Sequence, residues 1–278
     1  MKRVFTFGCS FTSFGWPTWA DILVEDFKNR SLEGYNFGRC GAGNQFVFIK
    51  LMEANAKFKF NEDDLVLICW STMQREDRFV NNDWVSPGLI YNQNIYTDSF
   101  VERWADPSFY VFRDSAIMSA TNLALKQLGC KFHQFSMHHI KQLDSNAPTT
   151  RFKNTSGIVE FYGDDIHLDS ISMMEYLGLT DHSPEAAEKR PRTYYGHETP
   201  KDSRPEWHPT VREHDKYLSE ILLPALNLEL TDKTKNFIED WNKKIESNEG
   251  VINLGTTGWE SHPKRELINV ENTEKDLI

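Results

Sequence analysis

Residues 65–70 read LVLICW, and this run decides the fold because all six side chains are apolar. Short, unbroken apolar runs are typical of strands buried on both faces, as the strands of parallel sheets are. Further strands are predicted at residues 4–7, 35–37 and 130–137, and the first two run directly into a glycine. The predicted sheet is therefore mostly parallel and covered on both sides.

Segments with helical spacing separate these strands. Apolar residues recur at intervals of three and four over residues 19–27, 46–56 and 112–128, and Gly129 closes the third segment. Another apolar stripe, at residues 211–223, predicts a helix late in the chain. Strands that alternate with helices predict the α/β fold class, here a three-layer α/β/α sandwich.

These elements predict one α/β domain, residues 1–225, which also contains two segments without a clear pattern. A long irregular stretch is expected at about 72–108, and an insertion rich in Pro, Asp, Ser and His at about 141–205. Residues 226–278 form a charged C-terminal extension with one predicted helix, at about 232–247. We expect this extension either to dock on the domain or to pair with a partner, so a homo-oligomer held by the extension is one predicted assembly.

The charge of the chain excludes several classes of partner. Its 278 residues include 41 Asp and Glu against 31 Lys and Arg, which gives a formal net charge of −10. An acidic protein repels phosphate backbones and anionic lipid, so we expect no nucleic acid and no membrane surface as a partner. There is no run of 18 apolar residues, no leader-like segment and no Cys-x-x-Cys pair among the four cysteines. The expected location is therefore the reducing cytoplasm.

The first candidate for chemistry is Ser10, in residues 8–12, GCSFT, directly after the first predicted strand. A serine on a tight turn there projects its hydroxyl from the carboxyl edge of the sheet, where open α/β sheets bind ligands. The helix expected next would offer N–H groups and a positive dipole end to an oxyanion. The plainer alternative is that Ser10 only caps that helix.

Two more segments lie at comparable places. Residues 36–44, NFGRCGAGN, follow the second strand, and a glycine there lets a backbone N–H approach a developing negative charge. Residues 205–209, PEWHP, precede the helix at 211–223. From there His208 can act as general base toward a serine, with Glu206 orienting its ring. Each segment alone also fits an ordinary turn or a surface histidine.

Taken in this order, the three segments resemble the sequence blocks of the SGNH/GDSL hydrolase family. The resemblance covers about residues 1–225 and implies a flavodoxin-like SGNH hydrolase fold. It implies Ser10 as nucleophile, His208 as base and Glu206 as the acid behind the base. It also implies an oxyanion hole formed by the backbone N–H groups of Ser10 and Gly41.

The chain departs from the family pattern in three respects. Cys9 stands where the family usually has Asp, and it is a rival nucleophile in principle. Glu206 lies two residues before the histidine, whereas the family acid lies three before it. The Asn that normally follows the third strand is absent, and Ser71 or Asn44 is predicted to replace it as an oxyanion donor. Losing one such donor costs on the order of 100-fold in rate or more.

These residues predict a serine esterase that hydrolyses a small or carbohydrate-linked ester through an acyl-enzyme intermediate. The aromatic side chains that are frequent between residues 70 and 113 suit sugar rings, and they equally suit packing. No metal and no organic cofactor are expected. Two alternatives stay open: an acyltransferase that uses the same residues, and a binding or assembly module of the same fold with weakened catalysis.

Other histidines offer weaker patterns. Residues 260–263, ESHP, repeat the Glu-x-His-Pro spacing, but no amphipathic helix follows His262, so His208 is favoured. The remaining candidates match neither a zinc nor a calcium pattern and are interpreted as solvated loop residues and a capped strand end. They are His133, His138, His139, Asp164, Asp165, His167 and Asp169.

Overall fold

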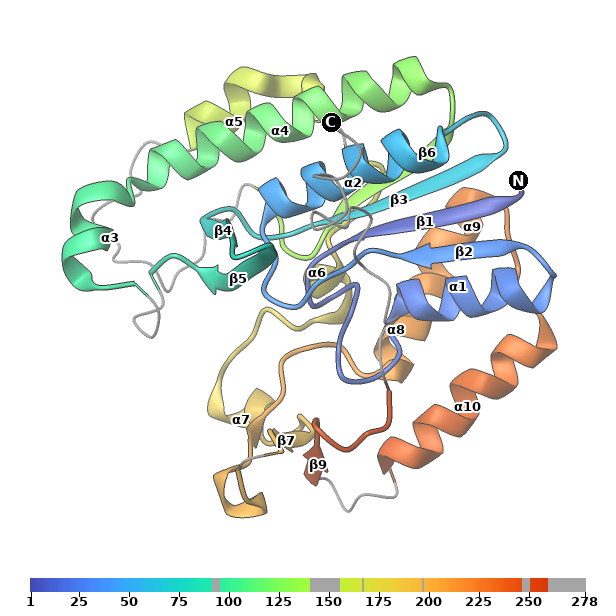
Figure 1. Cartoon of the computed structure of the whole chain (residues 1–278). Coiled ribbons are helices and arrows are strands. Elements are labelled where there is room, and N and C mark those ends of the chain that lie inside the picture. The colour runs from blue at the N-terminus through green and yellow to red at the C-terminus, as the bar shows by residue number, and fades with distance from the viewer. Residues whose placement is uncertain (92–95, 141–155, 167, 197, 247–250, 260–278) are drawn as a thin grey trace.

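A parallel sheet lies at the centre of the computed structural model (Figure 1). The residues that the structure describes are 1–91, 96–140, 156–166, 168–196, 198–246 and 251–259. The central strands are β1 Arg3–Gly8, β2 Glu33–Asn36, β3 Asp64–Trp70 and β6 Lys131–Ser136. Their order, β2-β1-β3-β6 with every pair parallel, is the order of flavodoxin-like doubly wound sheets.

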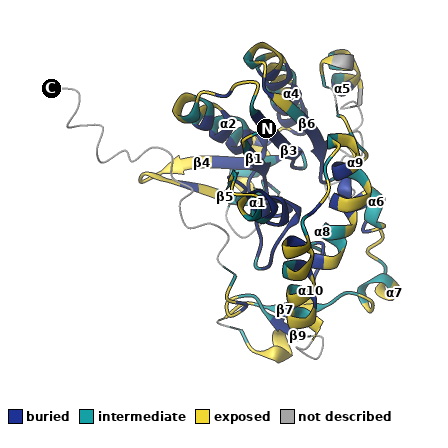
Figure 2. Ribbon diagram, turned by 90° about the vertical axis from the view of Figure 1, so that its right-hand side faces the viewer, coloured by how far each residue is buried: buried dark blue, intermediate teal, exposed yellow. Residues whose placement is uncertain are grey.

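Helices cover both faces of this sheet (Figure 1). One face carries α2 and α4, and the other carries α1, α8 and α10. Alternate side chains of residues 65–70 enter the two cores that these helices close, so every position of the strand has to be apolar. Figure 2 shows β1 and β3 buried between the layers. The predicted three-layer α/β/α sandwich with a parallel sheet is confirmed. The long helices are α1 Trp19–Asn29, α2 Asn44–Phe58, α4 Pro107–Leu128 and α10 Asp232–Glu246.

The remaining elements of the described residues are shorter. The helix α8, Val211–Tyr217, continues through a π-helical turn, Leu218–Leu222, into α9, Leu223–Leu226. The others are α3 Asp98–Trp104, α5 Ser156–Tyr162, α6 Met173–Leu177, α7 Pro184–Ala187, β7 Arg192–Tyr194, β8 Arg204–Pro205, β9 Val251–Asn253 and the 3-10 turns Gly163–Asp165 and Pro200–Asp202.

A β-hairpin occupies much of the stretch 72–108, so the prediction of an irregular segment there is wrong. Strand β4, Arg75–Val80, pairs antiparallel with β5, Asp83–Leu89. Asn81 and Asn82 join them with φ angles of 52° and 61°, the left-handed conformation that tight hairpin turns require. Neither strand alternates strictly between buried and exposed positions, which removed the usual strand signal. The Asn pair was the signal that could have found the turn.

The described part of the C-terminal extension packs on the domain. Asp26 of α1 accepts hydrogen bonds from the Thr231 N–H at 2.7 Å and from the Thr234 hydroxyl at 3.0 Å, which ties α10 to α1. Strand β9 then pairs parallel with β7 of the insertion. Residues 141–155 of the insertion and 260–278 of the extension lie outside the described residues, and pairing with a second copy stays a prediction.

None of the helices in the described ranges is both long enough and apolar enough to cross a bilayer.

Candidate active site

Ser10 lies in a turn at the carboxyl end of β1. Gly8 ends the strand and has to be glycine, because a Cβ there would lie 2.1 Å from Thr12 Oγ1 and 2.8 Å from the carbonyl oxygen of Cys69. The Cys9 carbonyl oxygen then accepts a hydrogen bond from the Thr12 N–H at 2.9 Å. The close packing of this turn fixes Ser10 at the carboxyl edge of the sheet.

The helix after Ser10 does not begin at the turn. Helix α1 starts at Trp19, and its N-cap is Thr18, which forms a reciprocal capping box with Asp21. Ser10 therefore neither caps α1 nor belongs to its first turn. Both expectations that tied Ser10 to a helix N-terminus are wrong, and any oxyanion donors have to come from the loops.

His208 reaches Ser10 from the loop between β8 and α8. Its Nε2 lies 2.8 Å from Ser10 Oγ, and its Nδ1 lies 2.6 Å from Glu206 Oε1. Thr193 donates its hydroxyl to Glu206 Oε2 at 2.8 Å. Because the carboxylate can only accept, Nδ1 carries the ring hydrogen, and Nε2 presents its lone pair to the serine hydroxyl. The three predicted residues thus form a continuous hydrogen-bonded relay.

Several contacts hold the His208 loop in place. Arg190 donates to the His208 carbonyl oxygen at 2.9 Å, and the indole N–H of Trp16 donates to the Pro209 carbonyl oxygen at 2.8 Å. The ring of Phe14 stacks on the imidazole with the centroids 4.0 Å apart. These contacts restrict both the backbone and the ring of His208, so the fold itself sets the distance to Ser10.

The ionisation state of Glu206 suits a carboxylate that orients and stabilises the base His208. Burial by itself raises the pKa of its carboxyl, but hydrogen bonds from the ring and backbone of His208 and from Thr193 outweigh burial and leave the pKa below its ordinary value. Glu206 is therefore ionised near neutral pH. An ionised carboxylate stabilises the imidazolium that forms when His208 takes a proton.

Gly41, the second predicted oxyanion donor, lies in the loop before α2. Its φ is 79°, and a Cβ there would lie 2.1 Å from the Ser86 carbonyl oxygen, so conformation and contact both require glycine. Within the described part of the chain, the N–H groups of Gly41 and Ser10 donate to no protein acceptor. Uncommitted N–H groups of this kind are what an oxyanion hole requires.

Asp77, on the hairpin, holds the Gly41 loop. Its Oδ1 accepts hydrogen bonds from the Gly43 N–H and the Ser86 hydroxyl, both at 2.9 Å, and its Oδ2 accepts one from the Phe46 N–H at 3.0 Å. A carboxylate at the N-terminus of α2 also complements the helix dipole. Asp77 is not among the predicted site residues, because it lies on the hairpin that the local sequence pattern does not predict.

Asn44 and Ser71 bind each other. The Ser71 N–H donates to Asn44 Oδ1 at 2.8 Å, and Asn44 Nδ2 donates to the Ser71 carbonyl oxygen at 3.2 Å and to Asp114 Oδ2 at 3.0 Å. Asn44 is fully buried, and both of its amide hydrogens are committed. The prediction that Asn44 is an oxyanion donor does not fit this geometry. Ser71 keeps only its hydroxyl as a donor, 3.7 Å from Met137 Sδ.

Cys9 and His133 have partners outside this relay. Cys9 is fully buried, with its thiol 3.5 Å from Met137 Sδ. His133 Nε2 lies 2.7 Å from the Ser170 hydroxyl. His262 lies outside the described residues. Within those that are described, no three His, Cys, Asp or Glu side chains are arranged to hold a metal ion. The aromatic side chains Trp70, Trp84 and Tyr110 are buried, as packing residues are.

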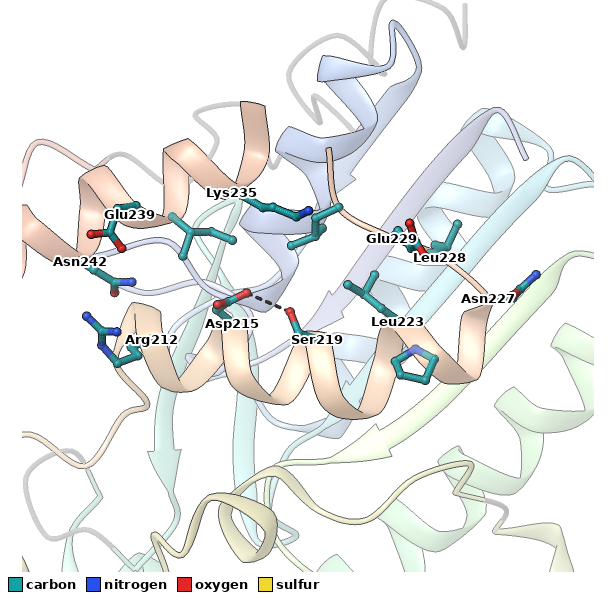
Figure 3. A pocket seen from close by; sticks show the side chains of 13 residues that line it. Arg212, Asp215, Ser219, Leu223, Asn227, Leu228, Glu229, Lys235, Glu239 and Asn242 are labelled. Carbon is teal, nitrogen blue, oxygen red and sulfur yellow. Dashed lines mark hydrogen bonds between the residues drawn. The ribbon is translucent and has the colours of Figure 1, made fainter. Parts of the chain in front are cut away.

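Access to Ser10 is narrow. Ser10 is 2% exposed, whereas 26% of the His208 side chain is exposed. A cavity of about 940 Å³ lies between the α8–α9 helix and α10 (Figure 3), and another of about 660 Å³ is lined from β6, α5 and α6. Neither cavity is lined by Ser10 or His208. The exposed part of the Ser10–His208 pair is therefore the imidazole.

A second histidine, His214 on α8, is fully buried, and neither of its ring nitrogens has a hydrogen-bond partner within the described residues. Burial, aided by the nearby His208, lowers its pKa to about 3. The folded protein therefore keeps His214 neutral down to that pH, whereas the unfolded chain protonates it below about pH 6.5.

Replacing His214 by leucine is therefore expected to reduce the acid sensitivity of the fold. Between pH 6.5 and 3 the unfolded state binds one more proton at this site, which lowers the free energy of unfolding by about 1.4 kcal/mol per pH unit as the pH falls. The free energy of unfolding, measured by urea unfolding from pH 7 to 4, should therefore fall less steeply with pH in His214→Leu, by about 1.4 kcal/mol per pH unit. The exposed His182, changed to Gln, is the control and should leave the slope as it is. An unchanged slope in His214→Leu would contradict the assignment.

Comparisons with known proteins find distant structural relatives. No family model matches the chain, and no curated protein matches it. The acetylxylan esterase Axe2 from Geobacillus stearothermophilus is similar in structure, with a TM-score of 0.45 and 13% identity, over 83% of this chain and 97% of that one. A GDSL-like lipase from Bacteroides thetaiotaomicron has a TM-score of 0.42 and 14% identity, over 81% and 88%. Similarities this distant say nothing about reaction or substrate.

Proposed function

We propose that this protein is a serine esterase with Ser10 as nucleophile, His208 as general base and acid, and Glu206 as the carboxylate that orients and stabilises the imidazole. The observation that carries the proposal is the relay from Ser10 Oγ through His208 to Glu206, at 2.8 and 2.6 Å. The nucleophile and its base lie within hydrogen-bond reach, and a third group orients the base, as activated serines require.

The mechanism follows from these contacts. Ser10 Oγ attacks the ester carbonyl carbon while its proton moves to His208 Nε2. The carbonyl oxygen becomes an oxyanion, held by the N–H groups of Ser10 and Gly41. His208 then gives the proton to the leaving alcohol, and an acyl-Ser10 ester remains. A water molecule, deprotonated by the same nitrogen, hydrolyses that ester and restores Ser10.

The burial of Ser10 favours a small acyl group. Because only 2% of Ser10 is exposed, its hydroxyl can attack a carbonyl carbon only if the acyl chain attached to that carbon is short. The alcohol side is less restricted, because it lies toward the exposed edge of His208. An exposed aromatic side chain suits a sugar or another small alcohol, and Tyr195 is 43% exposed, with the Arg204 guanidinium 5.3 Å from its ring centroid.

The test is hydrolysis of p-nitrophenyl esters of increasing acyl length. We expect turnover of the acetate ester and at least about 10-fold lower kcat/KM for the octanoate ester, since one methylene that does not fit lowers kcat/KM by about 10- to 200-fold. A serine-directed phosphonate should stop turnover at one equivalent. Absence of both turnover and labelling would favour the binding or assembly module. Acyl transfer to an added sugar in preference to water would identify an acyltransferase.

A further inference from the structure

Arg75 is the first residue of β4, and Figure 1 shows β4 beside the carboxyl ends of the central strands. Its Nη1 donates to the Ala42 carbonyl oxygen at 3.0 Å, so the guanidinium contacts the residue next to Gly41. Its Nη2 lies 3.8 Å from Met137 Sδ, and the same sulfur lies 3.5 Å from the thiol of Cys9, the residue next to Ser10. The guanidinium thus lies between the neighbours of the two residues whose N–H groups are uncommitted.

Among the described residues, no carboxylate lies within 4.0 Å of the Arg75 guanidinium. The other part-buried arginines there each pair with one: Arg3, Arg39, Arg113 and Arg190. The Nε of Arg75 is buried and has no hydrogen-bond partner. A part-buried cation that no carboxylate neutralises is costly unless it serves a ligand or a developing negative charge.

The backbone of Arg75 is also hydrogen-bonded. Arg113 donates to the Arg75 carbonyl oxygen at 2.7 Å, and Arg113 itself pairs with the fully buried Asp114 at 2.7 Å. Asp114 also accepts a hydrogen bond from Asn44. This buried network connects the start of the hairpin to the start of α2, on both sides of the Gly41 loop.

We propose that the Arg75 guanidinium is the third donor of the oxyanion hole, in the role that an Asn after the third strand was expected to fill. This inference rests on the proposed esterase function. As the bond from Ser10 Oγ to the carbonyl carbon forms, the carbonyl π electrons move to oxygen. The proton of Ser10 moves to His208, and the negative oxygen is bound by two backbone N–H groups and by a guanidinium N–H. When the tetrahedral intermediate collapses, the bond to the leaving oxygen breaks and that oxygen takes the proton from His208.

A competing role is recognition of a negatively charged substrate. The contacts with Ala42 and Met137 favour the oxyanion, because they hold the cation against the Gly41 loop and against the sulfur that also contacts Cys9. The two roles have different kinetic signatures. An oxyanion donor acts on kcat for neutral esters, whereas a substrate-recognition residue acts on KM for anionic esters only.

The experiment compares wild type, Arg75→Gln, Arg75→Lys, Arg75→Ala and the control Arg103→Gln, an exposed arginine on α3. Rates are measured for neutral p-nitrophenyl acetate, for its anionic hemisuccinate analogue and for phosphonate labelling of Ser10. We expect kcat for the acetate to fall about 100-fold in Arg75→Gln with KM little changed, and labelling to slow in parallel. Arg75→Lys should retain part of the rate, and methylguanidinium should restore part of it to Arg75→Ala. Arg103→Gln should match wild type.

Four outcomes overturn the proposal. Equal kcat and labelling rates in wild type and all Arg75 variants would remove Arg75 from the hole while leaving the esterase intact. A change confined to KM for the anionic ester would assign substrate recognition. If every Arg75 variant lost activity, had a lowered melting temperature and was not rescued by methylguanidinium, the role of Arg75 would be purely structural. No turnover and no labelling in folded wild type would remove the esterase proposal and the Arg75 role together.

Discussion

Replacing Ser10 by alanine is expected to lower kcat for ester hydrolysis on the order of 10⁴-fold or more, and replacing His208 by alanine should cause a loss of the same size. The two side chains act as one unit across the 2.8 Å contact between Oγ and Nε2. Without the imidazole the hydroxyl keeps its proton, and without the hydroxyl the imidazole has no nucleophile to activate. The measurement is kcat for p-nitrophenyl acetate with each purified variant.

The double variant Ser10→Ala/His208→Ala gives the sharper result. Because either single change already disables the relay, the double variant should be no slower than the singles. Losses that multiply instead would mean that the two residues act independently and would contradict the mechanism. Ser99→Ala and His182→Gln, at exposed positions, are the matched controls and should retain the wild-type rate.

Replacing Gly41 by alanine is expected to lower kcat by about 100-fold or more. The φ of 79° strains any residue with a Cβ, and the added methyl would lie 2.1 Å from the Ser86 carbonyl oxygen. The loop has to move away from β5 to relieve this clash, and the Gly41 N–H moves with it. The loss should appear in kcat rather than KM, because the N–H binds the oxyanion and not the ground-state ester.

Gly88 on β5, the strand against which the Gly41 loop packs, supplies a matched control. Its φ is 91°, and a Cβ there would meet nothing within 4 Å. Gly88→Ala should therefore lower the free energy of unfolding by about 1–2 kcal/mol, the cost of a left-handed alanine, and leave kcat near wild type. If Gly41→Ala also kept the wild-type kcat, the Gly41 N–H would not belong to the oxyanion hole.

The parallel sheet could be predicted because its signals are local. The apolar run 65–70 and the glycines that end the first two strands report burial and tight turns directly. Ser10 and His208 could be placed for the same reason: one follows a strand end and the other precedes an amphipathic helix. In the structure their side chains meet across the carboxyl edge of the sheet.

The parts that the sequence analysis missed depend on contacts between distant segments. Asp77 and Arg75 became visible only once the hairpin was known to lie against the Gly41 loop. Asn44 was at a suitable position in the sequence, but as the first residue of α2 its amide turns inward to Ser71 and Asp114. Nothing in the local sequence distinguishes an inward-facing amide from one that faces a substrate.

The most direct test of the central claim maps where a serine-directed phosphonate attaches. Wild type, Ser10→Ala and Cys9→Ala are treated with a p-nitrophenyl alkylphosphonate, and the adduct is located by peptide mass spectrometry. We expect one adduct per chain on Ser10 in wild type and in Cys9→Ala, and none in Ser10→Ala. An adduct on Cys9 or on another residue, or labelling that persists in Ser10→Ala, would contradict that claim.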